Sequence, residues 1–188
     1  GQPKAEVAAR RLTKLNPYVE IVPLVARLTR ENAKGVLDGY EIVIDGTDSF
    51  NSRYLINDAC VLFDKILIYG AIHQFEGQGS VFNLGDGPTY RCLFPEPPPA
   101  GSVPNCAEIG VVGVLPGIIG SIQALETIKV ITGTGDSLSG KLLLYDALSN
   151  TARTLGLSPD PKSREITELP EETSFCEANL AQPDSAIV

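Results

Sequence analysis

The stretch Tyr40-Glu41-Ile42-Val43-Ile44-Asp45-Gly46-Thr47-Asp48-Ser49-Phe50-Asn51-Ser52-Arg53 decides the fold of this 188-residue chain. Its apolar first part predicts a buried strand over residues 41–45. In open α/β sheets, ligands bind just beyond the carboxyl ends of strands. Two carboxylates, small hydroxyl side chains and Arg53 therefore stand where an anionic, metal-bearing ligand would bind. The same residue types also form Asx turns and helix N-caps, so a purely structural turn is the alternative.

Strand and helix patterns alternate on both sides of this stretch. Strands are predicted over residues 19–24, 41–45 and 66–69, and helices over residues 4–15, from Thr29 to about Leu37, and from Ser49 or Asn51 to about Phe63. The run 66–69 is continuously apolar, as in parallel sheets that are covered on both faces. The alternation predicts an α/β fold with a Rossmann-like doubly wound sheet, built by right-handed crossovers.

The pattern changes in the second half of the chain. Antiparallel strands are predicted over residues 79–84, 88–93, 141–146 and 152–157. Five prolines in the segment 94–106 predict a crossover loop. A helix is predicted from about Gly117 to Thr132, closed by Gly133. Its expected buried stripe consists of Ile118, Ile122, Leu125 and Ile128. The sheet is thus expected to be parallel in its first half, with antiparallel strands in the C-terminal half.

The C-terminal region has a different composition from the rest of the chain. From Ser158 onward it is polar, acidic and proline-rich. Such segments bury too little apolar surface to form a core. We therefore expect one domain over residues 1–158 and a surface or partly disordered extension over residues 159–188.

Charge and cysteine content restrict the class of protein. The net charge of −8 argues against nucleic acid as a main partner, because phosphate backbones require a basic surface. A nucleotide is still compatible with a local basic pocket. The four cysteines are widely spaced, a pattern of free thiols inside the cell. Since no apolar run approaches the roughly 18 residues of a membrane span, we expect a cytoplasmic protein without a membrane partner.

Three individual side chains are further candidates for chemistry: Lys4, Arg53 and Cys106. Lys4 lies in the first turn of a predicted helix, where lysines usually face solvent; alternatively, it neutralises phosphate while Asp48 holds Mg²⁺. Arg53 could face the strand end or form a salt bridge with Asp45 or Asp58. Cys106 follows the proline-rich loop, and both a reactive thiol and a small buried side chain remain open for it.

Taken together, ordered segments of this chain resemble the MoeB/ThiF group of ubiquitin-activating-enzyme-like adenylyltransferases. The matching segments include Gly1-Gln-Pro-Lys4, Leu15-Asn-Pro17, Asp45–Arg53, Tyr54–Cys60, Phe75–Gln78, Tyr90-Arg91, Pro95–Pro99, Cys106-Ala-Glu108, Gly117–Ala124 and Gly140–Asp146. The resemblance covers nearly all of residues 1–158. It implies ATP-dependent adenylylation of the C-terminal glycine carboxylate of a ubiquitin-like sulfur-carrier protein, for molybdopterin or thiamine biosynthesis.

The resemblance also implies roles for individual residues. Lys4 would contact the ATP phosphates, and Asp48 would bind Mg²⁺. Ser49, Arg53 and Asn57 would form the nucleotide-binding wall. Cys106 matches the loop cysteine of later sulfur or thioester chemistry, and together with Asp48 it is the expected catalytic residue.

Two features depart from the family pattern. Many members bind structural zinc through two Cys-x-x-Cys pairs. Here the first pair has Thr89 in place of its first cysteine, followed by Cys92, and the C-terminal region offers only Cys176. We therefore expect no structural zinc. The glycine-rich phosphate loop that precedes Gly-Gln-Pro-Lys in the family is also absent from this sequence, so we expect the chain alone to bind ATP poorly and to be inactive.

Two expectations concern partners. The apolar, glycine-rich segment 110–122 predicts a homodimer. An alternative to the enzyme is a non-catalytic partner or carrier-binding subunit of a ubiquitin-activating-enzyme-like heterodimer. The sequence does not distinguish carriers for molybdopterin, thiamine or transfer-RNA thiolation.

Overall fold

The computed structural model describes residues 1–98 and 110–170. These fall into two units, one formed by Gly1–Leu28 and the other beginning at Thr29. The first unit contains α1 (Lys4–Leu15), which confirms the predicted helix. Asn16 ends this helix in an extended conformation, as expected for the residue before Pro17.

Two predictions near the N-terminus are wrong in part or in full. Residues 19–24, all described, form no strand. A strand needs a neighbour to pair its backbone N–H and C=O groups, and the described sheet provides none for this segment. The predicted helix 29–37 is shortened to α2 (Ala33–Leu37). Thr29 and Asn32 instead exchange side-chain-to-backbone hydrogen bonds in the preceding turn.

The second unit is built on a five-stranded sheet with the order β1-β2-β3-β4-β5. Its strands are β1 (Ile42–Asp45), β2 (Ile66–His73), β3 (Glu76–Phe82), β4 (Lys141–Asp146) and β5 (Thr151–Gly156). β1 and β2 are parallel, and all later pairs are antiparallel. The predicted change from parallel to antiparallel pairing is therefore confirmed. β2 continues beyond β1, because Asp45 pairs with Tyr69 and four further residues of β2 follow.

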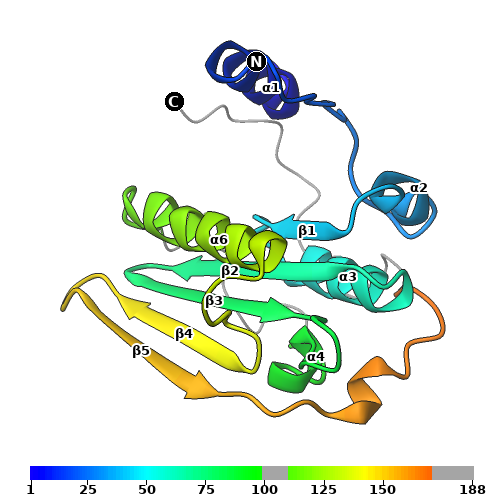
Figure 1. The fold of residues 1–188 in the computed structure, drawn as a ribbon, viewed down its shortest axis with the longest axis vertical. Helices are drawn as coiled ribbons and strands as arrows, with labels where there is room; N and C mark the ends of the chain where they lie inside the picture. The colour runs from blue at the N-terminus through cyan, green and yellow to red at the C-terminus, as the bar shows by residue number, and fades with distance from the viewer. Residues whose placement is uncertain (99–109, 171–188) are drawn as a thin grey trace. The chain divides into compact units, whose positions relative to one another are not determined.

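Helix α6 (Leu115–Thr132) packs on one face of β2 and β3 (Figure 1). Glycines in both strands allow this close approach. A Cβ atom on Gly70 would lie 2.5 Å from Gln123 Cδ, and one on Gly77 would overlap the Ile119 side chain. The helix ends at Gly133 in the left-handed conformation, as predicted.

The buried stripe predicted for α6 is wrong at Leu125 and Ile128, whereas Ile118 and Ile122 are half-buried. Leu125 and Ile128 are 53% and 57% exposed. The buried positions are Leu115, Ile119, Gln123 and Glu126. The sequence pattern predicted that the polar side chains of this helix face solvent. Glu126 is instead buried, where it accepts a hydrogen bond from Leu138 N at 2.7 Å and pairs with Lys129. These polar contacts turn a different face of the helix toward the sheet.

The opposite face of the sheet carries α3 (Phe50–Leu62) and α4 (Tyr90–Leu93). An aromatic cluster fills the space beneath them, formed by Tyr54, Tyr69, Phe82, Tyr90 and Phe94. The strand predicted over 88–93 is wrong, because Thr89 caps a short helix there and the Tyr90 N–H is bound by the Asn57 side chain at 2.8 Å. The Thr89 cap and the hydrogen bond to the distant Asn57 together override the strand propensity of this segment.

Part of the expected C-terminal extension is anchored to this unit. Residues Pro161–Arg164 form the 3₁₀ helix η1. Arg164 donates to Asn83 Oδ1 at 2.8 Å and to the Gly85 and Gly87 carbonyl oxygens at 2.7 Å. The division at residue 158 otherwise stays a prediction. Among the described residues, no helix combines the length and apolar character required to cross a membrane.

Candidate functional site

The loop between β1 and α3 begins with an Asx turn. The buried Asp45 carboxylate accepts hydrogen bonds from Thr47 N at 2.8 Å and Thr47 Oγ1 at 2.7 Å. Burial raises the pKa of Asp45 by more than these hydrogen bonds and the nearby Arg53 charge lower it. Asp45 therefore stabilises the turn, as the structural alternative predicted, and its carboxylate is bound by Thr47 within the loop.

Asp48 and Ser49 lie at the exposed tip of this loop. Ser49 is the N-cap of α3, where its hydroxyl oxygen accepts from Ser52 N at 3.2 Å. Such a cap satisfies one of the unpaired N–H groups at the helix start. Asp48 is thus held directly beside a rigid helix terminus, with its carboxylate exposed.

Arg53 connects the loop to the sheet. Its Nη2 donates to the Thr47 carbonyl oxygen at 3.2 Å. The guanidinium carbon lies 5.7 Å from the centre of the Phe50 ring and 5.9 Å from that of Tyr69, within cation–π range. Asp58, one of the two ion-pair partners suggested for Arg53, pairs with Arg91 instead. Arg53 therefore places a positive charge against the Asp48 loop.

A cavity of about 150 Å³ lies at the carboxyl end of β1, beside the continuing half of β2. Asp48 and Arg53 line it together. The remaining lining residues are Gly46, Thr47, Gly70, Ala71, Ile72, Pro116, Ile119, Gly120 and Gln123. The position agrees with the rule for ligand sites in α/β sheets. Small-molecule sites usually measure roughly 300–1,000 Å³, so these residues enclose only part of a nucleotide-sized ligand.

Gln123 is a component of this cavity that the sequence interpretation missed. Its side chain is 8% exposed, and Nε2 donates to the carbonyl oxygens of Asp45 at 2.7 Å and Ile68 at 3.3 Å. These contacts join α6 to the ends of β1 and β2. No local sequence signal identified it, because its burial depends on the packing of α6 against the sheet; once buried, the amide must be hydrogen-bonded.

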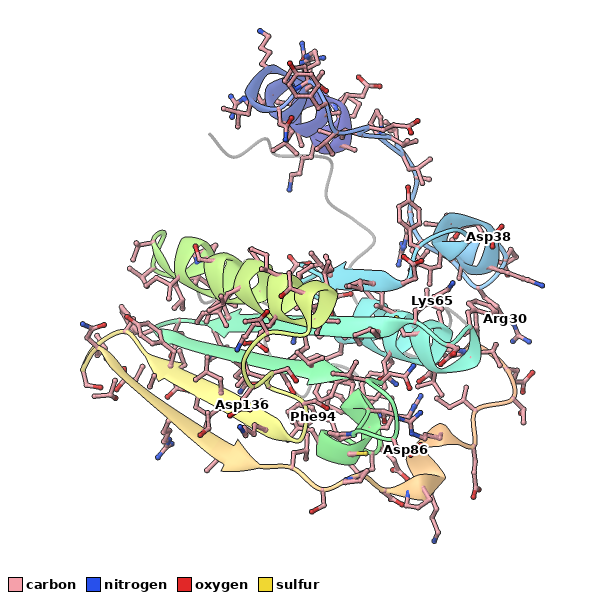
Figure 2. The ribbon with its side chains drawn as sticks, viewed as in Figure 1. Arg30, Asp38, Lys65, Asp86, Phe94 and Asp136 are labelled. Carbon is pink, nitrogen blue, oxygen red and sulfur yellow. The ribbon has the colours of Figure 1, made fainter. Side chains whose placement is uncertain are left out.

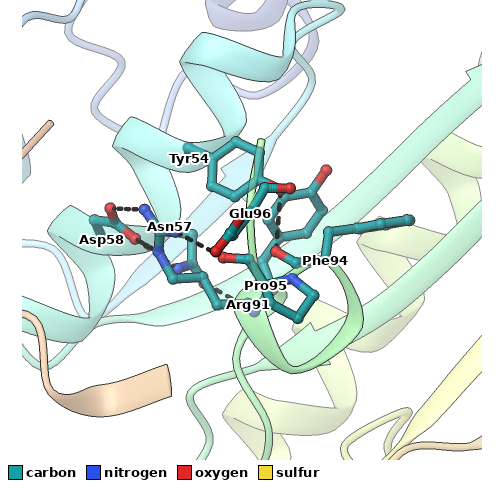
Figure 3. Close-up of polar contacts among 8 residues, drawn as sticks. Tyr54, Asn57, Asp58, Arg91, Phe94, Pro95 and Glu96 are labelled. Carbon is teal, nitrogen blue, oxygen red and sulfur yellow. Dashed lines mark hydrogen bonds and ion pairs between the residues drawn. The ribbon is translucent and has the colours of Figure 1, made fainter. Parts of the chain in front are cut away.

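Asn57 lies in the core and not on the cavity wall. Its Nδ2 donates to Asp58 Oδ1 at 3.0 Å, and its Oδ1 accepts from Tyr90 N. Figure 3 shows how Asp58 in turn faces Arg91, which donates to it through Nε at 2.7 Å and Nη2 at 2.6 Å. Arg91 also donates to the Pro95 carbonyl oxygen at 3.0 Å. Asn57 thus organises α3, α4 and the segment that follows them.

The other predicted site residues lie elsewhere in the chain. Lys4 is the first residue of α1 and is exposed, and it belongs to the first unit. Cys106 and Cys176 lie outside the described residues. Cys60 is fully buried, and burial raises its pKa to about 12. The structure therefore brings together Asp48, Ser49 and Arg53, and places Asn57 behind them.

Solved structures with the same fold include Escherichia coli MccB. The structure titled with ATP superposes with a TM-score of 0.71 at 15% identity, over 86% of this chain and 49% of that one. The structure titled with MccA-N7isoASN gives a TM-score of 0.73 at 16% identity, over 86% and 51%. At such identities the likeness shows the fold alone.

Sequence relatives are much closer. A sulfur carrier protein adenylyltransferase from Thermus thermophilus is 52% identical over 86% of this chain and 62% of that protein. The SAMP-activating enzyme E1 of Haloferax volcanii is 47% identical over 86% and 59%. A probable adenylyltransferase/sulfurtransferase MoeZ from Mycobacterium tuberculosis is 44% identical over 94% and 46%. This chain spans less than two thirds of the length of each of these relatives. The ThiF family profile matches residues 1–166, and the chain belongs to the ThiF family.

Proposed function

We propose that this chain contributes the carboxylate-activating part of an ATP-dependent adenylyltransferase that acts on a ubiquitin-like sulfur-carrier protein. The observation that carries the proposal is the cavity at the end of β1, where Asp48 and Arg53 face the same space. The names of sequence relatives, among them the Thermus sulfur carrier protein adenylyltransferase, support the reaction class. The carrier serves molybdopterin or thiamine biosynthesis in this proposal.

The charges around the cavity suit adenylyl transfer. In this reaction, the terminal carboxylate of the carrier attacks the α-phosphorus of ATP, and pyrophosphate leaves. Negative charge on the phosphate oxygens increases in the transition state, and a fixed cation stabilises it. Arg53 supplies one such charge from the cavity wall, and Lys4 is the second cation that the family resemblance implies. No general base is needed, because the attacking carboxylate is already ionised.

A magnesium ion fits the residues present. Mg²⁺ is usually held by one or two carboxylates together with substrate phosphates and water. Asp45 is occupied by Thr47, so Asp48 is the exposed carboxylate of this loop. Asp48 would hold the ion, which neutralises phosphate charge when bound. Ser49 keeps Asp48 in place by capping α3.

The test uses the full-length parent protein and carrier-dependent exchange between ATP and pyrophosphate. Asp48→Ala is expected to lower the exchange rate by roughly 100-fold. The matched control is Asp38→Ala, because Asp38 is also exposed but lies at the end of α2, before the amino end of β1 (Figure 2). Full exchange activity of Asp48→Ala would reject the proposed role and favour a non-catalytic carrier-binding subunit. Cys106→Ala should leave the exchange intact and abolish only the later sulfur or thioester step.

We also infer a homodimer. Helix α6 exposes Leu125, Ile128 and Ile131 by 53%, 57% and 69%, at a spacing that places them on one side of the helix. An apolar row of this kind is typical of a protein interface. Light scattering should give twice the chain mass, and Ile128→Asp should reduce it to the monomer. Leu148→Asp is the control, since Leu148 is 74% exposed in the turn after β4. A monomeric wild-type protein at tens of micromolar would contradict the inference.

A further inference from the structure

The sulfur of Cys92 lies where two distant segments meet. From its own segment, the Thr89 N–H donates to Sγ at 3.3 Å, and Thr89 Oγ1 lies 3.7 Å away. From the C-terminal segment, the Asp160 N–H donates to Sγ at 3.2 Å, and Ser163 Oγ lies 3.1 Å away. Four polar groups, from α4 and from η1, therefore converge on one sulfur atom.

The two segments share a spacing. Thr89-x-x-Cys92 and Asp160-x-x-Ser163 each place two residues three positions apart. Structural zinc in the resembling proteins is held by two Cys-x-x-Cys pairs, and four thiolates at about 2.3 Å from zinc lie about 3.8 Å from one another. The distances from Cys92 Sγ to Thr89 Oγ1 and Ser163 Oγ are 3.7 Å and 3.1 Å. The side chains of Thr89 and Ser163 are therefore about as far from the Cys92 sulfur as one zinc ligand is from another, and Asp160 reaches the sulfur through its backbone N–H.

The chemistry of the four positions does not fit zinc. Zinc in proteins selects thiolate, imidazole or carboxylate ligands, and two of these positions carry neutral hydroxyl groups. The Asp160 carboxylate caps η1, accepting from Lys162 N at 3.0 Å. Within the part of the chain that the structure describes, no group of three or more His, Cys, Asp or Glu side chains could hold a metal ion.

We propose that a metal-free, hydrogen-bonded junction centred on Cys92 joins α4 to η1. Each donor at this junction has an acceptor without a metal ion. Two backbone N–H groups donate to the sulfur, and the Ser163 hydroxyl donates to the Asp160 carbonyl oxygen at 2.7 Å. Ser163 Oγ is then available to accept the thiol proton of Cys92. Ser163 is 6% exposed, so its two hydrogen bonds are partly shielded from water, whereas the Asp160 N–H to sulfur bond lies at the surface.

The neighbouring residues strengthen the same connection. Arg164, next to Ser163, donates to Asn83 and to the backbone of residues 85 and 87. Arg91, next to Cys92, is bound to the buried Asp58. Each side of the junction is thus fixed by charged hydrogen bonds to the body of the unit, and the connection does not depend on a bound ion.

The first test measures zinc content and thermal unfolding of the 188-residue chain, with and without a chelator. No stoichiometric zinc and an unchanged unfolding midpoint are expected. Ser163→Ala should lower the midpoint equally in both conditions, because it removes a hydrogen bond and no metal ligand. One zinc per chain, together with a lower midpoint after chelation, would overturn the proposal.

The second test restores the ligands. The variant Thr89→Cys/Asp160→Cys/Ser163→Cys carries two Cys-x-x-Cys pairs and should bind one Co²⁺ per chain with thiolate charge-transfer absorption. Adding Cys92→Ser to this variant should remove most of the absorption, whereas adding Cys176→Ser should not change it. A restored variant that folds but binds no cobalt would show that the two segments do not have the proposed geometry. Neither test depends on adenylylation activity.

Discussion

The buried carboxylate of Asp58 and the guanidinium of Arg91 form a two-point ion pair, with donor–acceptor distances of 2.7 Å and 2.6 Å. Asp58 comes from α3 and Arg91 from α4, so the pair joins two helices that lie far apart in the sequence. The Asp58 side chain is 3% exposed. Removing one partner of such a pair leaves a buried charge without compensation.

Arg91→Ala is therefore expected to lower the free energy of unfolding by about 3 kcal/mol. Arg91→Lys should recover only part of this loss, because an ammonium group cannot reproduce both hydrogen bonds. Denaturant unfolding measures both variants. In the double-mutant cycle, Asp58→Ala/Arg91→Ala should cost clearly less than the sum of the single changes. Additive costs would mean that the pair contributes little.

The hydroxyl groups of Tyr54 and Tyr90 should differ in their contributions to stability. Tyr54 Oη lies 3.0 Å from the Phe94 carbonyl oxygen and 2.8 Å from that of Glu96, and its proton is shared between them. Tyr90 Oη is buried and has no hydrogen-bond partner among the described residues. Tyr54→Phe should therefore cost about 1 kcal/mol, whereas Tyr90→Phe should be close to neutral. Equal losses in urea unfolding would contradict this difference.

The Asp45 turn predicts a pH dependence of stability. Because burial raises the pKa of Asp45 in the folded state, its contribution to stability is fully present below the unfolded pKa and is lost as the pH rises through the folded value. Asp45→Asn removes this titration and keeps an oxygen that accepts both Thr47 hydrogen bonds. The unfolding free energy of Asp45→Asn relative to wild type should therefore rise as the pH increases above the ordinary pKa of an aspartate.

Asp45→Ala is the control for the hydrogen bonds themselves. It leaves the Thr47 donors without an acceptor and should cost about 1–3 kcal/mol at neutral pH. Asp45→Asn should lose much less at the same pH. If both variants lost the same amount, the turn would depend on the charge of Asp45 and not on its oxygen.

Gly70 should tolerate no side chain, whereas its cross-strand partner Gly79 should. A Cβ atom on Gly70 would meet Gln123 at 2.5 Å, but one on Gly79 would lie 3.6 Å from Ile122, an ordinary contact. Gly70→Ala should therefore cost about 1–3 kcal/mol, and Gly79→Ala much less. Gln123→Ala should reduce the additional cost of Gly70→Ala, because it frees the space. Equal costs for the two alanine variants would show that α6 does not press on β2 at this point.

Local rules were sufficient for the elements with strong sequence signals. β1, β2 and β4 coincide with apolar runs of the sequence, and α3 begins at the predicted cap Ser49. The predictions failed where a distant partner decides. Residues 19–24 have strand-like composition but no neighbouring strand in the described sheet. Residues 88–93 became a helix because Asn57 binds the Tyr90 N–H from another helix.

The candidate site divides in the same way. The sequence identified the loop 45–53 as a turn followed by a helix cap, because turn and cap chemistry is local. It could not identify Gln123, nor distinguish the buried Asp45 from the exposed Asp48, because burial depends on α6 packing against the sheet.

By itself, the sequence determined the family, the change from parallel to antiparallel pairing and the residues that can carry charge at the end of β1. Only the tertiary structure decided which polar groups are occupied. Asp45 is bound by Thr47, Asp58 by Arg91, and Cys92 by donors from η1, some 70 residues later in the chain. The physical reason is that a hydrogen bond or ion pair depends on the distance between two atoms. That distance is set by how segments pack in the folded chain, and local sequence patterns do not show which distant segments come into contact.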